Sequence, residues 1–173
     1  MPISKPDKRA LYANANAYAE SEEYQDYIIR HFYDSTSSAY GHTLNFHYRK
    51  SDGYLRKRCI RYKVSGATTF LHEKFHLPSD ISDYIVKNVL FDAFFSHEVC
   101  LWLLTTDCDT YNMIIDDPNG EMIGYGYVNS STHDWRNGPL YTDRLCIVFE
   151  RLAWGGFVIK TAYPYLAGMD NDA

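Results

Sequence analysis

The chain has little of several features that would narrow its class at once. Only four of its 173 residues are cysteines; they are scattered without a CxxC pair, and three lie in or beside apolar runs. A thiol in such a run behaves as a small core residue, so we expect reduced cysteines and no disulfides. No apolar run approaches the roughly 20 residues of a membrane span. Residues 1–40 are polar and lack the apolar core of a signal peptide, so we expect a soluble chain that does not export itself.

The chain also lacks an excess of positive charge. Its formal net charge is -5, which excludes a protein that coats nucleic acid through bulk positive charge. The cations are nevertheless concentrated, because residues 47–63 contain seven of the seventeen Lys and Arg side chains and one carboxylate, Asp52. These seven are Arg49, Lys50, Arg56, Lys57, Arg58, Arg61 and Lys63. The window predicts a local site for an anion within an acidic protein.

The first half of the chain has the patterns of helices. Residues 17–32 predict one amphipathic helix, and the Ser/Thr run at 35–38 predicts a break after it. Further helices are expected at 41–62, divided near Gly53, and at 79–95. We expect a polar N-terminal arm or helix at 1–36, a main domain at 37–168 and an acidic tail at 169–173.

From about residue 99 the pattern favours strands, at 100–105, 111–116, 121–128, 144–151 and 156–164. The run Asp117-Pro118-Asn119-Gly120 predicts a hairpin between the second and third of them, and 129–143 reads as a long loop. Helices followed by a meander of strands predict an α+β fold, with N-terminal helices packed on a single antiparallel sheet of about four to five strands.

Two segments about a hundred positions apart contain side chains suited to cleaving RNA without a metal. That reaction needs a base for the 2′-hydroxyl, stabilisation of the charged phosphorane and an acid for the leaving 5′-oxygen. His47 has the imidazole for the first task, and Arg58 has the planar fork that holds two phosphate oxygens. Thr161 and Tyr163 add two hydroxyls, and their spacing of two places both on one face of a strand.

Four motifs occur in a fixed order along the chain. They are Gly41-His42-Thr43-Leu44-Asn45-Phe46-His47, the eleven-residue step from His47 to Arg58, Ser65-Gly66-Ala67-Thr68-Thr69-Phe70, and Thr161-Ala162-Tyr163-Pro164. Over about residues 40 to 166 this set resembles the ribonuclease A-like C-terminal toxin domain of bacterial contact-dependent growth inhibition effectors. The chain departs from that pattern at Phe46, where a basic residue often precedes the catalytic histidine.

The resemblance implies a ribonuclease A-like fold and a metal-independent endoribonuclease without cofactors. Its catalytic residues would be His47, Arg58, Thr161 and Tyr163. The product would be a 2′,3′-cyclic phosphate, formed when His47 takes the 2′-hydroxyl proton and Arg58 stabilises the charge on phosphorus. The family acts in the cytoplasm of target bacteria after delivery from a producing cell, and a cognate immunity protein neutralises it. The chain would be either an excised toxin domain or a free-standing relative, and a monomer when free.

Further residues are candidates for holding the RNA, with tRNA among the possible substrates. His42 supports the catalytic set, the cations near it contact the RNA backbone, and the tryptophan of the long loop stacks on a base. The candidates are His42, Lys50, Arg61, Lys160 and Trp135.

Two alternatives remain open from the residues. His72-Glu73-Lys74-Phe75-His76 fits the HExxH pattern of a zinc metalloprotease. However, Pro78 lies two residues beyond His76, and the residue before a proline is pushed out of the helical region, so a zinc-binding helix would end too soon. The other alternative is a non-catalytic binding or immunity-type module.

Overall fold

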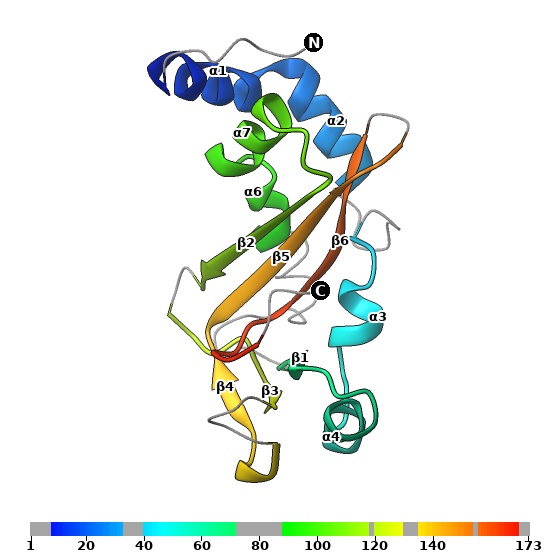
Figure 1. Cartoon of the computed structure of the whole chain (residues 1–173). Helices are drawn as coiled ribbons and strands as arrows, with labels where there is room; N and C mark the ends of the chain where they lie inside the picture. Colours follow the sequence, from blue (N-terminus) through cyan, green and yellow to red (C-terminus); the bar gives the residue numbers. More distant parts are fainter. Residues whose placement is uncertain are drawn as a thin grey trace.

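The protein is described from a computed structural model, which covers residues 8–32, 40–71, 88–117, 120–129, 135–153 and 156–169. The chain is an α+β protein, as predicted, and its strands pair antiparallel throughout the described part. The strands form two three-stranded sheets where a single sheet was expected. The helices within 8–32 and 91–105 gather at one end of the larger strands, and the smaller sheet lies at the other end (Figure 1).

Two helices, α1 (Lys8–Glu20) and α2 (Glu22–Phe32), replace the single helix expected at 17–32. They separate at Ser21, whose hydroxyl donates to the Tyr18 carbonyl at 2.7 Å and accepts from the Tyr24 amide at 3.3 Å. A serine that bonds the backbone on both sides competes with continuous helix. Tyr24, Ile28 and Phe32 of α2 are buried in the main core, as the amphipathic pattern indicated. The expected domain boundary near residue 36 lies outside the described residues and stays a prediction.

The strand predicted at 100–105 is wrong. This segment belongs to helix α7 (His97–Thr105), which buries Val99, Cys100 and Trp102 against the main core. Ser96 caps the helix by accepting a hydrogen bond from the Val99 amide at 3.4 Å. A short apolar run has no periodicity that separates strand from buried helix, and here packing decides. Of the helix expected at 79–95, residues 88–95 are described, and they contain the short α6 (Phe91–Ala93).

The larger sheet has the order β2-β5-β6, formed by β2 (Thr110–Asp116), β5 (Arg144–Arg151) and β6 (Phe157–Pro164). The smaller sheet has the order β1-β3-β4, formed by β1 (Gly66–Phe70), β3 (Gly124–Val128) and β4 (Leu140–Thr142). Because β2 and β3 belong to different sheets, the hairpin predicted between them is wrong. The turn signal itself is present, since the Gly120 amide donates to the Asp117 carbonyl at 2.9 Å and Gly120 has φ +67.

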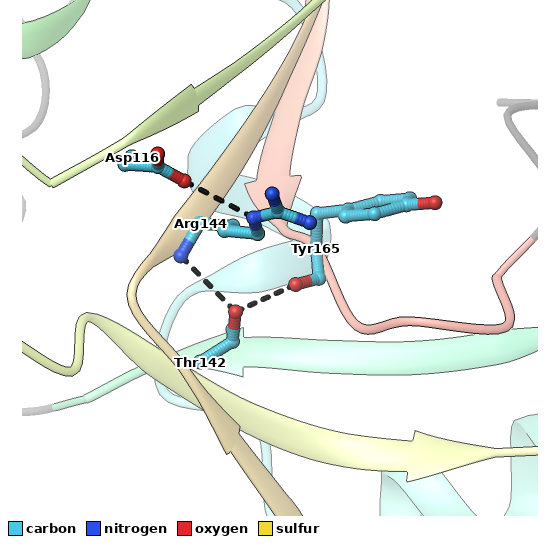
Figure 2. A network of polar contacts seen from close by, with 4 residues as sticks. All are labelled: Asp116, Thr142, Arg144 and Tyr165. Carbon is cyan, nitrogen blue, oxygen red and sulfur yellow. Dashed lines mark hydrogen bonds and ion pairs between the residues drawn. The ribbon is translucent and has the colours of Figure 1, made fainter.

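The two sheets meet where the chain passes from β4 to β5. Thr142 donates its hydroxyl to the Tyr165 carbonyl at 2.7 Å and accepts the Arg144 amide at 3.0 Å, and Arg144 pairs with Asp116 at 3.0 Å (Figure 2). The network therefore ties together the ends of β2, β4 and β6 and the start of β5. At the same junction Gly124 allows β3 to approach β6, because a Cβ there would lie 2.3 Å from the Pro164 side chain. This tight bend divides the strands into two sheets.

Two further helices, α3 (Thr43–His47) and α4 (Asp52–Arg61), connect the helical end to the smaller sheet. They confirm the division expected within 41–62, although the break lies at 48–51 and Gly53 is inside α4. Arg49 in that break has φ +51. Leu55 and Cys59 of α4 pack on Ala67 and Tyr127 of the smaller sheet. This packing places the remaining face of α4, with its cations, away from the core.

All four cysteines are reduced, and Cys108 is the exposed one among them. No helix among the described residues combines the length and the apolar character needed to cross a membrane.

Candidate active site

A pocket of about 560 Å³ lies where α3, the C-terminal end of α4 and β6 meet. It is lined by all four residues of the predicted catalytic set, His47, Arg58, Thr161 and Tyr163. Lys63 adds a second cation and His42 a second imidazole, and no Asp or Glu is among the described residues that line it. The pocket is therefore suited to an anionic ligand.

A β-bulge in β6 turns Thr161 and Tyr163 toward this pocket. Phe157 and Ile159 face the main core, and a regular strand would send residues 161 and 163 to that same face. The pairing with β5 shifts instead, so that Ile159 lies opposite Phe149 and Thr161 opposite Val148. The extra residue reverses the alternation, a common use of bulges near functional sites. The two hydroxyls share one face as predicted, and the bulge determines which face it is.

Backbone contacts hold α3 against β6. The His42 amide donates to the Lys160 carbonyl at 2.9 Å, and the Ala162 amide donates to the buried Thr43 hydroxyl at 3.0 Å. Gly41, at φ +53, makes the approach possible, because a Cβ there would lie 2.0 Å from the Lys160 carbonyl oxygen. Since His47 is on the last turn of α3, this docking places its ring 5.3 Å from the Tyr163 ring, centroid to centroid.

Strand β1 holds His47 from the other side. Its ring Nδ1 lies 3.1 Å from the Thr68 carbonyl, and its own carbonyl accepts the Thr69 hydroxyl at 3.0 Å. The Thr69 oxygen also accepts the Lys50 amide at 3.1 Å. A carbonyl only accepts, so Nδ1 carries the proton in this contact and the lone pair of the neutral ring is on Nε2. Ring position and tautomer are thus both determined by neighbouring backbone.

The pKa of His47 is lowered from 6.5 to about 4. Burial is the main cause, and the positive charges of Arg58, His42 and Lys50 add to it, while the bond to the Thr68 carbonyl opposes the change. The imidazole is therefore neutral at pH 7, which is the form that accepts a proton.

Arg58 brings a guanidinium to the pocket. It lies 6.0 Å from the Phe46 ring centroid and makes no hydrogen bond or ion pair with the other residues that the structure describes. Arg58 is in the last turn of α4, whose C-terminal carbonyls favour a cation. With respect to the described residues, the donors of this fork are available for the oxygens of a phosphate.

Thr161 has a buried hydroxyl with an unsatisfied hydrogen-bonding capacity. The residue is 6% exposed, and within the described part of the chain its Oγ1 has no hydrogen-bond partner. An unpaired buried polar group is costly and calls for an explanation, such as a ligand that completes it. Tyr163, two residues on, is also buried and packs beside Cys146 and Val148.

The predicted substrate-binding residues are placed differently. His42 lines the pocket, while Lys50, Arg61, Lys160 and Trp135 do not. Lys50 lies over the Tyr54 ring at 5.3 Å, Lys160 is 3.9 Å from Glu150, and Arg61 is exposed at the end of α4. Trp135 packs beside the cluster of Leu55, Cys59, Ala67 and Tyr127. A role in RNA binding stays a prediction for all five.

The zinc alternative lies outside the described residues, since His72, Glu73 and His76 fall in 72–87. In the ranges that are described, no group of three or more His, Cys, Asp or Glu side chains is placed to hold a metal ion.

The sequence patterns did not predict a role for the residues that position the site. Thr43, Thr68 and Thr69 make the contacts that hold His47 and α3, and Tyr62 lines the pocket just after α4. Their sequence signal was weak, because threonine is ordinary in strands and an exposed tyrosine is common.

Comparisons with known proteins give one structural likeness. No protein-family model matches the chain, and no curated protein matches it. The fold is similar to a chain in the crystal structure of the CdiA-CT/CdiI complex from Y. kristensenii 33638, with a TM-score of 0.55 and 17% sequence identity. The match covers 73% of this chain and 100% of that one. The protein therefore has a fold similar to that of one chain of the CdiA-CT/CdiI complex.

Proposed function

We propose that the protein is a metal-independent endoribonuclease toxin, with the ribonuclease A-like character that its motifs imply. The observation that carries the proposal is the meeting of His47, Arg58, Thr161 and Tyr163, from both ends of the main domain, in one cationic pocket. The unpartnered Thr161 hydroxyl in that pocket adds a group that a ligand would complete.

In the proposed reaction, Nε2 of neutral His47 takes the proton of the RNA 2′-hydroxyl. The 2′-oxygen attacks phosphorus, the bond from phosphorus to the 5′-oxygen breaks, and a 2′,3′-cyclic phosphate forms. Arg58 stabilises the charge on the phosphorane through two parallel hydrogen bonds. Thr161 donates to a phosphate oxygen or to a pyrimidine edge. The leaving 5′-oxygen takes its proton from Tyr163 or from water, because a histidine with a pKa of about 4 is rarely protonated at pH 7.

The biological setting in this proposal is competition between bacteria. The toxin cleaves RNA, with tRNA as one candidate, in the cytoplasm of a target cell and stops its growth. A cognate immunity protein protects the producing cell. The support for a partner is that the similar fold was solved within a two-protein complex.

Cleavage of RNA in EDTA tests this function. The purified protein should degrade RNA and leave 2′,3′-cyclic ends, and His47→Ala should abolish cleavage while circular dichroism shows an intact fold. His31→Ala is the matched control, because His31 is an exposed histidine on α2 whose ring lies tilted against the Tyr27 ring outside the pocket. Cleavage that is lost in EDTA and restored by zinc would contradict the proposal.

An immunity-type or other non-catalytic binding module is the second candidate, because the structural likeness is to one chain of a complex of two proteins. Simultaneous replacement of His47, Arg58 and Thr161 by alanine separates the two functions. A binding module would keep its full biological effect, whereas the ribonuclease would lose it.

A further inference from the structure

The pocket has exposed aromatic walls beside the four residues assigned to chemistry. Phe46 is 39% exposed and Tyr62 is 66% exposed, and both line the pocket. Phe46 immediately precedes His47 on α3, and Tyr62 follows the end of α4, where its amide donates to the Arg58 carbonyl at 3.1 Å. Phe46 therefore adjoins His47 in sequence, and Tyr62 is joined to Arg58 by a backbone hydrogen bond.

The surroundings of Phe46 add polar and cationic groups around its ring. The His42 ring lies 4.9 Å from the Phe46 ring, and the Arg58 guanidinium lies 6.0 Å from it on the pocket side lined by both residues. The ring contacts of Phe46 therefore leave more than a third of the side chain in water, which is a large apolar area to leave uncovered in a pocket.

We propose that Phe46 and Tyr62 are base-stacking residues of the pocket, so that a base of the RNA lies against their rings. This inference rests on the proposed ribonuclease function and assigns two further residues that bind its substrate. An aromatic ring stacks on the face of any base, and a base can reach it only when it has left its own helix. Arg58 and Lys63 then lie beside the phosphate of the same nucleotide, since they line the pocket with no described carboxylate among them.

The combination of aromatic rings and cations in the pocket indicates which kind of ligand it binds. A purely apolar ligand would leave the cations of the pocket and the Thr161 hydroxyl without partners, and a bare phosphate would leave both rings exposed. A nucleotide offers a base for the rings and a phosphate for the cations. Stacking distinguishes little between bases, so we expect a preference for unpaired over paired RNA that is stronger than any preference for one base.

Binding of uncleavable RNA tests this inference separately from catalysis. The probe is a fluorescent single-stranded 2′-O-methyl RNA decamer of mixed sequence, whose blocked 2′-oxygen cannot attack phosphorus. Its dissociation constant is measured by anisotropy at one salt concentration, alongside the same decamer in a duplex and an abasic ribose-phosphate decamer. The proteins are the wild type, Phe46→Leu, Tyr62→Leu and the ring-retaining Phe46→Tyr.

The wild type should bind the single strand more tightly than the duplex. Phe46→Leu and Tyr62→Leu should each bind the single strand about 5- to 50-fold more weakly, the range expected for loss of a base-stacking ring. Phe46→Tyr should bind like the wild type, and all variants should bind the abasic decamer alike, because only the base contact is changed. Tyr141→Leu is the matched control, since Tyr141 is 58% exposed on β4 and does not line the pocket.

Unchanged affinity of both leucine variants, or equal binding of duplex and single strand by the wild type, would overturn the inference. If the protein cleaves RNA but shows either result, the ribonuclease function stands and the base site fails. If ring-dependent binding is present without any cleavage, the base site stands and the ribonuclease function fails.

Discussion

Two arginines at opposite ends of the larger sheet show how differently the same side chain is used. Arg151, at the end of β5, donates to the carbonyls of Trp102, Leu103, Thr106 and Cys108 at 2.9 to 3.2 Å and lies 4.8 Å from the Trp102 ring centroid. It closes the C-terminal end of α7, where carbonyls lack partners within the helix. Arg58 makes no such bonds with the described residues and faces a pocket.

The different hydrogen bonding of the two arginines indicates a structural role for Arg151 and a functional role for Arg58. Arg151 is held in place by carbonyls of the fold, and its loss would leave the Leu103 and Thr106 carbonyls without this partner. A guanidinium held only by packing contributes little to stability and keeps its fork for a phosphate. The same contrast applies to two threonines near the pocket. Thr69 bridges the His47 carbonyl and the Lys50 amide, whereas the buried Thr161 oxygen has no described partner.

Replacement of Arg58 or Arg151 by lysine should have the largest effects. Arg58→Lys should lower kcat/KM for RNA by roughly 10²- to 10³-fold, because the bidentate contact to the phosphorane is lost. Its free energy of unfolding should stay within about 0.5 kcal/mol of the wild type. Arg151→Lys should do the reverse and lower the free energy of unfolding by about 1 to 3 kcal/mol, while the folded protein keeps its activity.

Urea denaturation and initial rates of RNA cleavage measure the two effects. The comparison breaks down if Arg58→Lys destabilises the protein as much as Arg151→Lys does, since Arg58 would then also be structural.

Valine at Thr161 should separate activity from stability. Thr161→Val keeps the shape and removes the unpartnered hydroxyl, so stability should be unchanged or rise by up to about 1 kcal/mol. Activity should fall by about tenfold, the size of a lost hydrogen bond to the transition state. Thr161→Ser retains the hydroxyl and should retain most of the activity. A loss of stability in Thr161→Val would show that the hydroxyl already has a partner.

The low pKa of His47 predicts a dependence of stability on pH. The folded group titrates at about pH 4 and the unfolded group near 6.5, so between these values the unfolded chain binds the extra proton. This contribution is full above pH 6.5 and is lost as the pH falls to 4, a loss of about 2 kcal/mol. His47→Gln should lack it, so the difference between the two unfolding curves at pH 7 and pH 4.5 isolates the effect.

The same pKa predicts the acid limb of catalysis. On the acid side of its pH profile, kcat/KM should fall near pH 4, where His47 of the free enzyme becomes protonated, and not near pH 6.5. An acid limb near 6.5 would mean that the base is a histidine in water, in conflict with the half-buried ring that bonds the Thr68 carbonyl.

Valine at Thr69 should change stability in the opposite direction to valine at Thr161. Thr69→Val leaves the His47 carbonyl and the Lys50 amide without their shared partner, so it should destabilise by about 1 to 2 kcal/mol. Urea denaturation of the two valine variants side by side measures the contrast. Equal effects at both positions would remove the distinction between a bonded and an unbonded hydroxyl.

Much of the fold could be predicted from local pattern, and the failures have physical causes. The strands at 111–116, 144–151 and 156–164 were predicted to within a residue or so of β2, β5 and β6, because alternation and flanking turns are local signals. The segment 100–105 failed because an unbroken apolar run suits a buried helix equally well. The single sheet failed because the bend at Thr142 and Arg144 depends on contacts with Asp116 and Tyr165, far away in sequence.

The sequence by itself determined the chemical inventory of the site. It supplied an imidazole and a guanidinium eleven residues apart, and two hydroxyls whose spacing of two puts them on one face of a strand. The tertiary structure alone decided what these groups face and whether they are free. The bulge opposite Val148 and Phe149 turned Thr161 and Tyr163 away from the main core, and the bonds to Thr68 and Thr69 set the position of His47. The physical reason is that strand alternation and helix periodicity are local, whereas burial, register and hydrogen-bond saturation depend on distant parts of the chain.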